Sequence, residues 1–169
     1  MIVTGSEDGF VRIWNATSHI NLRSANAGTD VNGVAWSPNG QYVAAALNDD
    51  TINIYYASNF TSLHGSISVD VGGGDQVNSV QFSPDNSLVA VAIGRSGNSG
   101  TNGEITLIKT SDGTEFGNMN PNSEDRFYDL AFSPDGRHIA AAGNGDFFVV
   151  NVTTSATVWS ISDPSASVN

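Results

Sequence analysis

Apolar residues along the chain fall in short runs that are separated by polar segments rich in Gly, Asn, Asp and Ser. Within several runs, large side chains alternate with small or polar ones, as Val34 and Trp36 do, and Val80 and Phe82. This period-2 pattern is typical of β-strands with one buried face. No apolar stripe of 3.6-residue period extends over a helical length, so the pattern predicts an all-β protein with little helix.

One two-strand pattern occurs three times. Its copies are residues 31–40 (VNGVAWSPNG), 77–86 (VNSVQFSPDN) and 127–136 (FYDLAFSPDG), and they begin 46 and 50 residues apart. Each copy runs from an apolar strand into a turn in which Pro presets φ, while Gly or Asn tolerates a positive φ. A second strand is expected directly afterwards, at residues 42–47, 88–93 and 138–142. These second strands are almost continuously apolar, which is typical of a sheet that is buried on both faces.

A third and a fourth strand complete each unit. The third is expected at residues 10–14, 51–55, 104–108 and 147–150. The last residue of each range lies six residues after a turn Asp or Asn, as Trp14 does after Asp8. The fourth strand is more polar and is expected near residues 19–23, 63–68, 114–118 and 157–161. Four short strands that recur every 40–50 residues or so form the repeating blade of a β-propeller.

Two motifs resemble the WD-repeat (Trp-Asp repeat) family of β-propellers. Residues 5–14, GSEDGFVRIW, are similar to the family's turn and third strand, and the Phe-Ser-Pro-Asp-Gly run is similar to its first hairpin. The resemblance implies a propeller of about three and a half four-stranded blades, an incomplete ring in this chain.

The repeats diverge from the family pattern at two places. The residues in the position of the family's Asp are Asn15, Tyr56, Lys109 and Asn151. The Gly-His element before the first strand is missing from every repeat, so the hydrogen-bond tetrad that its His would join cannot form. The blades are therefore expected to depend on apolar packing and on the hydrogen bonds between paired strands.

The expected units form one propeller domain over residues 1–169. Its parts are a partial blade 1 at 1–23, blade 2 at 31–68, blade 3 at 77–118, blade 4 at 127–161 and the start of a further blade at 165–169. Either the chain is a piece of a longer propeller, or other copies of the chain complete the ring or build a filament. A self-contained ring of four blades fits the strand count least.

Charge and composition disfavour several functions. Six Lys and Arg residues against 17 Asp and Glu give a formal net charge of −11, which disfavours binding to nucleic acid or to an anionic membrane surface. The chain has no cysteine, so disulfides, thiol catalysis and thiolate metal sites are ruled out. No apolar run approaches the ~20 residues of a membrane-spanning helix, so no membrane insertion is expected. The first residues lack a signal-peptide pattern, and the localisation stays open between cytoplasm and extracellular space.

No group of residues points to catalysis, a cofactor or a metal ion. His19, His64 and His138 fall at unrelated strand positions without metal-ligand spacing. Turn carboxylates such as Asp8 and Asp49 are expected to accept hydrogen bonds from their own loops. We therefore expect a non-catalytic scaffold that mediates protein-protein interaction or assembly, without cofactor or metal. A propeller enzyme is an alternative that no residues of this chain support.

One irregular insertion, residues 94–103, lengthens the loop between the second and third strands of blade 3. A tolerated surface insertion explains it without a function, whereas loops on a rigid scaffold often carry binding residues. In a propeller this loop emerges at the same end as the links between blades, so we expect that end to bind a protein partner. Tyr128, where the other copies have Asn, either packs or projects its ring there. The candidate partner-binding residues are Arg95, Asn98, Asn102, Arg126 and Tyr128.

Three N-glycosylation sequons follow third strands: Asn15-Ala16-Thr17, Asn59-Phe60-Thr61 and Asn151-Val152-Thr153. They are therefore expected at the end of the propeller opposite to the insertion. A chain so rich in Asn, Ser and Thr contains sequons by chance, and unmodified turns are the simplest explanation. If the chain is secreted, that end carries glycans. The alternative function is then a secreted or cell-surface structural glycoprotein, including a self-assembling filament subunit.

Overall fold

The computed structural model describes residues 1–69, 75–95, 103–121, 127–143 and 145–162. These parts contain 15 strands and no helix. The first sheet consists of β1 (Ile2–Gly5), β2 (Phe10–Trp14) and β3 (Asn21–Asn26), and the second of β4 (Val31–Trp36), β5 (Tyr42–Leu47), β6 (Thr51–Tyr56) and β7 (Ser62–Ser68). The third consists of β8 (Asp75–Phe82), β9 (Leu88–Arg95), β10 (Glu104–Lys109) and β11 (Glu115–Met119). The fourth consists of β12 (Asp129–Phe132), β13 (His138–Ala142), β14 (Asp146–Asn151) and β15 (Thr157–Ser162).

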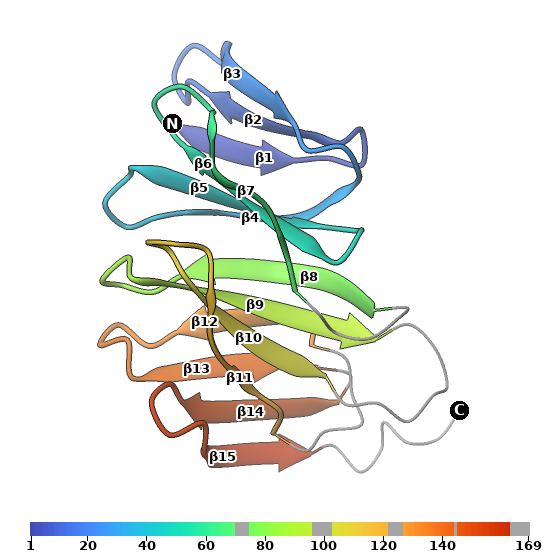
Figure 1. Ribbon diagram of the computed structural model, residues 1–169, viewed down its shortest axis with the longest axis vertical. Coiled ribbons are helices and arrows are strands. Elements are labelled where there is room, and N and C mark those ends of the chain that lie inside the picture. The colour runs from blue at the N-terminus through green and yellow to red at the C-terminus, as the bar shows by residue number, and fades with distance from the viewer. Residues whose placement is uncertain (70–74, 96–102, 122–126, 144, 163–169) are drawn as a thin grey trace.

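The four antiparallel sheets are the blades of an open propeller arc, and we call them blades 1 to 4. In each sheet the spatial order of the strands follows the chain. Figure 1 shows the sheets stacked along the long axis, with β1–β3 at the top and β14–β15 at the bottom. The first strands β4, β8 and β12 contact one another in succession. The predicted all-β propeller is confirmed, with three strands in blade 1 and four in each of the others.

The first hairpin of each four-stranded blade closes with the same hydrogen-bonded turn. Ser83 Oγ donates to Asp85 Oδ1 (2.6 Å) and accepts from the amide of Leu88 (2.9 Å). Asp85 Oδ1 also accepts from the amide of Ser87 (3.0 Å). The same contacts recur in the turns of Ser37 with Asn39 and of Ser133 with Asp135. The last turn residue has a positive φ in every copy, which explains its identity: Gly40, Asn86 and Gly136.

The apolar core is divided into three clusters, each between two neighbouring blades. The cluster between blades 1 and 2 includes Val11, Ile13 and Leu47, that between blades 2 and 3 includes Ile52, Ile54 and Val91, and that between blades 3 and 4 includes Leu107, Ile139 and Val150. All nine of these side chains are at most 1 % exposed. Blades 2 and 3 therefore bury apolar side chains on both faces, as the continuous apolar runs of their second strands predicted, whereas blades 1 and 4 each adjoin one cluster.

Side-chain hydrogen bonds also join neighbouring blades. Asn32 Nδ2 donates to the carbonyl oxygen of Val77 (2.9 Å), and Asn78 Nδ2 donates to that of Phe127 (2.7 Å). Only apolar packing and hydrogen bonds between paired strands were expected from the sequence. These bridges are an additional contribution, and each is worth about 0.5–1.5 kcal/mol.

Several strand boundaries differ from the expected ones, and two of the differences change a loop. β3 begins at Asn21 instead of residue 19, because the amide of His19 donates to the carbonyl of Asn15 (2.9 Å) and His19 itself has a φ of 59°. This tight turn occupies the start of the expected strand. β9 continues as far as Arg95, which pairs with Asp75 of β8, so the strand extends into the segment that was expected to be loop.

Candidate functional site

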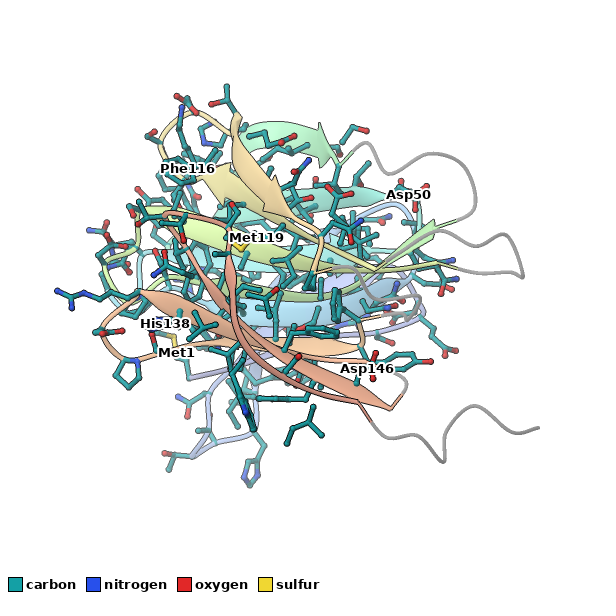
Figure 2. The ribbon with its side chains drawn as sticks, turned by 90° about the horizontal axis from the view of Figure 1, so that it is seen from below. Met1, Asp50, Phe116, Met119, His138 and Asp146 are labelled. Carbon is teal, nitrogen blue, oxygen red and sulfur yellow. The ribbon has the colours of Figure 1, made fainter. Side chains whose placement is uncertain are left out.

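The loops of the arc gather at two opposite ends. The turn end, as we call it, carries the turns within the first hairpins and those between third and fourth strands: residues 37–41, 83–87, 133–137, 15–20, 57–61, 110–114 and 152–156. The link end carries the turns between second and third strands and the links between blades. In Figure 2, Met1, Phe116 and His138 lie toward the turn end, whereas Asp50 and Asp146 lie toward the link end.

The expected partner surface belongs to the link end. Tyr128 is 50 % exposed there, at the position where Asn32 and Asn78 bridge to the next blade. Arg95 lies at the end of β9, and its side chain falls outside the described part of the structure. The other three candidates, Asn98, Asn102 and Arg126, also lie outside the described residues, as does the segment 165–169.

The three sequon asparagines lie at the turn end. The side-chain Oδ1 of Asn15, Asn59 and Asn151 accepts a hydrogen bond from the amide two residues further on, at 2.8, 3.0 and 3.0 Å. Asn59 is exposed, and the other two are half-buried. No Nδ2 of the three donates to a side chain or carbonyl among the described residues. Each sequon therefore has an uncommitted amide nitrogen at the same end of the arc.

Several turn carboxylates are held in their ionised form by local hydrogen bonds. The Arg12 guanidinium, which forms a 2.7 Å ion pair with Asp8, holds the pKa of that carboxyl below its usual value. Hydroxyl donors have the same effect on three other carboxyls, so that the pKa values of Asp85, Asp112 and Asp135 are also lowered. The amide of Phe10 donates to Asp8 Oδ1 (3.1 Å), which confirms the capping role expected of Asp8. The largest cause of each shift is a hydrogen bond from a residue two to four positions away along the chain.

His19 lies in blade 1, His64 in blade 2 and His138 in blade 4, and His64 makes a contact with the next blade. Its Nε2 lies 2.8 Å from the carbonyl oxygen of Thr110. Within the described ranges, no three His, Cys, Asp or Glu side chains are placed to hold a metal ion. The described residues also include no helix that is long and apolar enough to cross a membrane.

A β-bulge interrupts the pairing of the third and fourth strands in every blade. The extra residue is apolar and exposed in three of them: Leu22 (42 %), Phe116 (51 %) and Val158 (57 %). In blade 2 the irregular region instead contains His64, which reaches to Thr110. These bulges were not predictable from the sequence, because one added residue in a short polar strand leaves no trace in the periodicity.

Grooves open between neighbouring blades at the turn end. The groove between blades 3 and 4 encloses about 700 Å³, and the one between blades 1 and 2 about 710 Å³. Phe116 lines the former and Leu22 the latter. The groove between blades 2 and 3, where His64 contacts Thr110, encloses only about 330 Å³. Two of the three exposed bulge residues, Leu22 and Phe116, therefore line the two larger of these grooves.

A solved structure with a similar fold is the β-propeller domain of Cps50 (Swd1) from Myceliophteria thermophila. Its TM-score is 0.77 at 14 % sequence identity, over 95 % of this chain and 51 % of that one. The chain thus spans about half the length of that propeller domain. A search of curated proteins finds no match.

The sequence profile described as "WD domain, G-beta repeat" (WD40) matches residues 1–15, 20–55, 65–101 and 117–151. These four matches cover most of the chain and repeat at the spacing of the blades. They agree with the four stacked sheets and with the structural neighbour. The chain therefore belongs to the WD40 repeat family of β-propellers.

Proposed function

We propose that this chain is a non-catalytic scaffold, which binds other proteins through surfaces at the ends of its blades. WD40 propellers generally serve as protein-interaction scaffolds. The observation that carries the proposal is the way in which the blades are fixed: fully buried clusters and Asn bridges join each described pair of four-stranded blades. Loops on such a support are pre-organised, which lowers the entropic cost of binding a partner.

At the link end, we propose that Tyr128 is an anchor for a partner, together with Arg95, Asn98, Asn102 and Arg126. Tyr and Arg are enriched among the residues that dominate binding energies. Support comes from the exposure of Tyr128 at a position where two other blades use Asn for a bridge.

The test is affinity capture followed by quantitative mass spectrometry. Tyr128→Asn restores the residue that two other first strands carry, so we expect the fold to be retained. Ser58→Ala, at an exposed position of the turn end, is the control. At least one captured protein should fall fivefold or more with Tyr128→Asn and stay unchanged with Ser58→Ala. If both variants retain every captured protein, Tyr128 is not an anchor, and if the wild type captures none, the scaffold proposal is wrong.

A secreted or cell-surface structural glycoprotein is the second candidate function. It is supported by three sequon asparagines with uncommitted Nδ2 atoms at one end of the arc. The measurement is the intact mass of the native protein before and after enzymatic removal of N-linked glycans. A loss of glycan mass would support the candidate, and unmodified Asn15, Asn59 and Asn151 would exclude it.

A further inference from the structure

The groove between blades 3 and 4 combines an exposed aromatic ring with carboxylates on both of its walls. We propose that it binds an extended segment of a partner protein that carries a bulky apolar side chain next to an arginine or a lysine. This proposal rests on the scaffold function and deepens it, because it names the chemistry of a partner at the turn end, opposite to Tyr128.

Phe116 is the apolar centre of the groove. Its ring sits on the β-bulge of β11, is 51 % exposed and lies at the turn end in Figure 2. Around it, Leu88 of blade 3 and Val152 of blade 4 line the groove, together with Pro84 and Pro134. Aromatic side chains are enriched in the buried centres of protein interfaces. A bulky apolar side chain of a partner would cover Phe116 and remove its ring from water.

The two walls of the groove carry equivalent carboxylates. Asp85 stands on the hairpin turn of blade 3 and Asp135 on that of blade 4, and both line the groove. Hydrogen bonds from Ser83 and Ser133 lower the pKa values of the two carboxyls, so both are ionised at neutral pH. Both acidic turns therefore face the space that a partner would occupy.

Two cations lie near these carboxylates. Lys109, the only lysine of the chain, lines the groove, and its charge helps to lower the pKa of the neighbouring Asp112. Arg137 lies 3.9 Å from Asp135 and is largely exposed. Among the residues that line the groove, two carboxylates, Asp85 and Asp135, stand against one cation, Lys109. The lining of the groove is therefore negatively charged, like the whole chain with its net charge of −11. This charge attracts a basic segment.

The other two grooves lack this combination. The groove between blades 1 and 2 has Arg23 on its wall and no Asp or Glu in its lining. In the smaller groove between blades 2 and 3, Asn39 occupies the position that corresponds to Asp85 and Asp135. These two grooves therefore provide natural controls within the same chain.

The experiment uses the full ¹⁵N-labelled chain and three capped hexapeptides, Gly-Arg-Leu-Phe-Arg-Gly and its counterparts with Glu or Ser in place of Arg. Binding is measured by amide chemical-shift changes during titration. We expect saturable shifts at Leu88, Phe116 and Gly136, and at least tenfold tighter binding of the Arg peptide than of the Glu peptide.

Two sets of variants test the apolar and the acidic part separately. Phe116→Ser should weaken binding of the Arg peptide at least tenfold, whereas Leu22→Ser, at the corresponding bulge of blade 1, should leave it unchanged. The double variant Asp85→Asn/Asp135→Asn should lose the preference for the Arg peptide. Asn39 forms the same turn hydrogen bonds in blade 2, so this variant is expected to keep its fold.

Equal affinity for the three peptides, shifts confined to another surface, or unchanged binding by Phe116→Ser would overturn the groove proposal. A glycan on the native Asn151 would overturn it as well, because Val152 and Thr153 of the same sequon line the groove. Such results leave the scaffold function standing if a partner that depends on Tyr128 is still captured. Failure of the scaffold function is a separate result, in which the wild type captures no protein.

Discussion

The packing of one blade against the next is tested most directly by Leu107→Ala. Leu107 lies on β10 in the cluster between blades 3 and 4, where its side chain is 1 % exposed. If the blades are held together by these clusters, shortening this side chain must lower the free energy of unfolding far more than the same change at a surface position. Leu22→Ala is the matched control, since Leu22 occupies a bulge and is 42 % exposed.

The expected magnitude follows from the burial of the side chain. The substitution removes three carbon atoms at about 0.8 kcal/mol for each buried methylene, which gives about 2.4 kcal/mol of lost transfer free energy. A residual cavity of about 40 Å³ adds about 1 kcal/mol, at roughly 24 cal/mol per Å³. Leu107→Ala should therefore lower the free energy of unfolding by about 3.4 kcal/mol. The control Leu22→Ala should lower it by less than about 1 kcal/mol.

Urea unfolding, followed by circular dichroism and by tryptophan fluorescence, measures both values. Trp36 in β4 and Trp159 in β15 report on blades 2 and 4. A change of less than 1 kcal/mol for Leu107→Ala, equal to that of the control, would refute the packing described here. Blades that unfold independently, with transitions by circular dichroism and by fluorescence that do not coincide in the wild type, would refute it in a second way.

Three further predictions concern the bridges, the turns and the outer face of blade 4. Asn78→Ala leaves the carbonyl of Phe127 without its inter-blade donor and should lower the free energy of unfolding by about 1–2 kcal/mol in thermal or urea denaturation, whereas no change would show that the bridge is not formed. Because the folded-state pKa of Asp135 is below its unfolded value, its stabilising contribution is present above about pH 4 and is lost as the pH falls through the folded pKa. Asp135→Asn should therefore flatten the acid limb of a denaturation profile, and an unchanged slope would contradict this. Trp159 is 51 % exposed beside Phe147 on the outer face of blade 4. If other copies of the chain cover this face, light scattering should give the wild type a mass above that of one chain and Trp159→Ser a mass nearer to it. A monomeric wild type would exclude such an assembly.

The hairpin turns were predictable from the sequence because everything that determines them is local. The Ser hydroxyl, the Asp or Asn acceptor and the residue with positive φ all lie within a few residues of one another, as Ser83, Asp85 and Asn86 do. The buried strands were predictable for a related reason, since a blade that is covered on both faces leaves a continuous apolar run such as that of β5.

The candidate groove was not predictable in the same way, because it forms between two blades. Phe116 looked like one apolar residue in a polar strand, and only the register of β10 and β11 shows that it is an extra residue at a bulge. The Asn hydrogen bonds between blades were more predictable from the sequence. Asn32 and Asn78 stand at the same place in two repeats, and a polar residue kept at the start of an otherwise apolar strand indicates a specific partner for its side chain. Tyr128 is the exception in the third repeat, and its exposed ring takes the place of a bridging Asn.

In the hairpin turn, one terminal atom of the Asn or Asp side chain closes the loop, while the other decides whether the side chain is charged. All three copies use the Oδ1 atom of an Asn or an Asp to close the turn, as Asn39 and Asp135 illustrate. The other terminal atom takes no part in these shared bonds: Asn39 Nδ2 donates to Gln41 Oε1 (3.3 Å), whereas Asp85 Oδ2 accepts from Ser87 Oγ (2.9 Å). Replacing Asn by Asp, or Asp by Asn, in one turn would change the charge of a single groove between blades while the backbone stays in place. A propeller built in this way offers a row of similar clefts whose selectivity for ligands can be altered one cleft at a time.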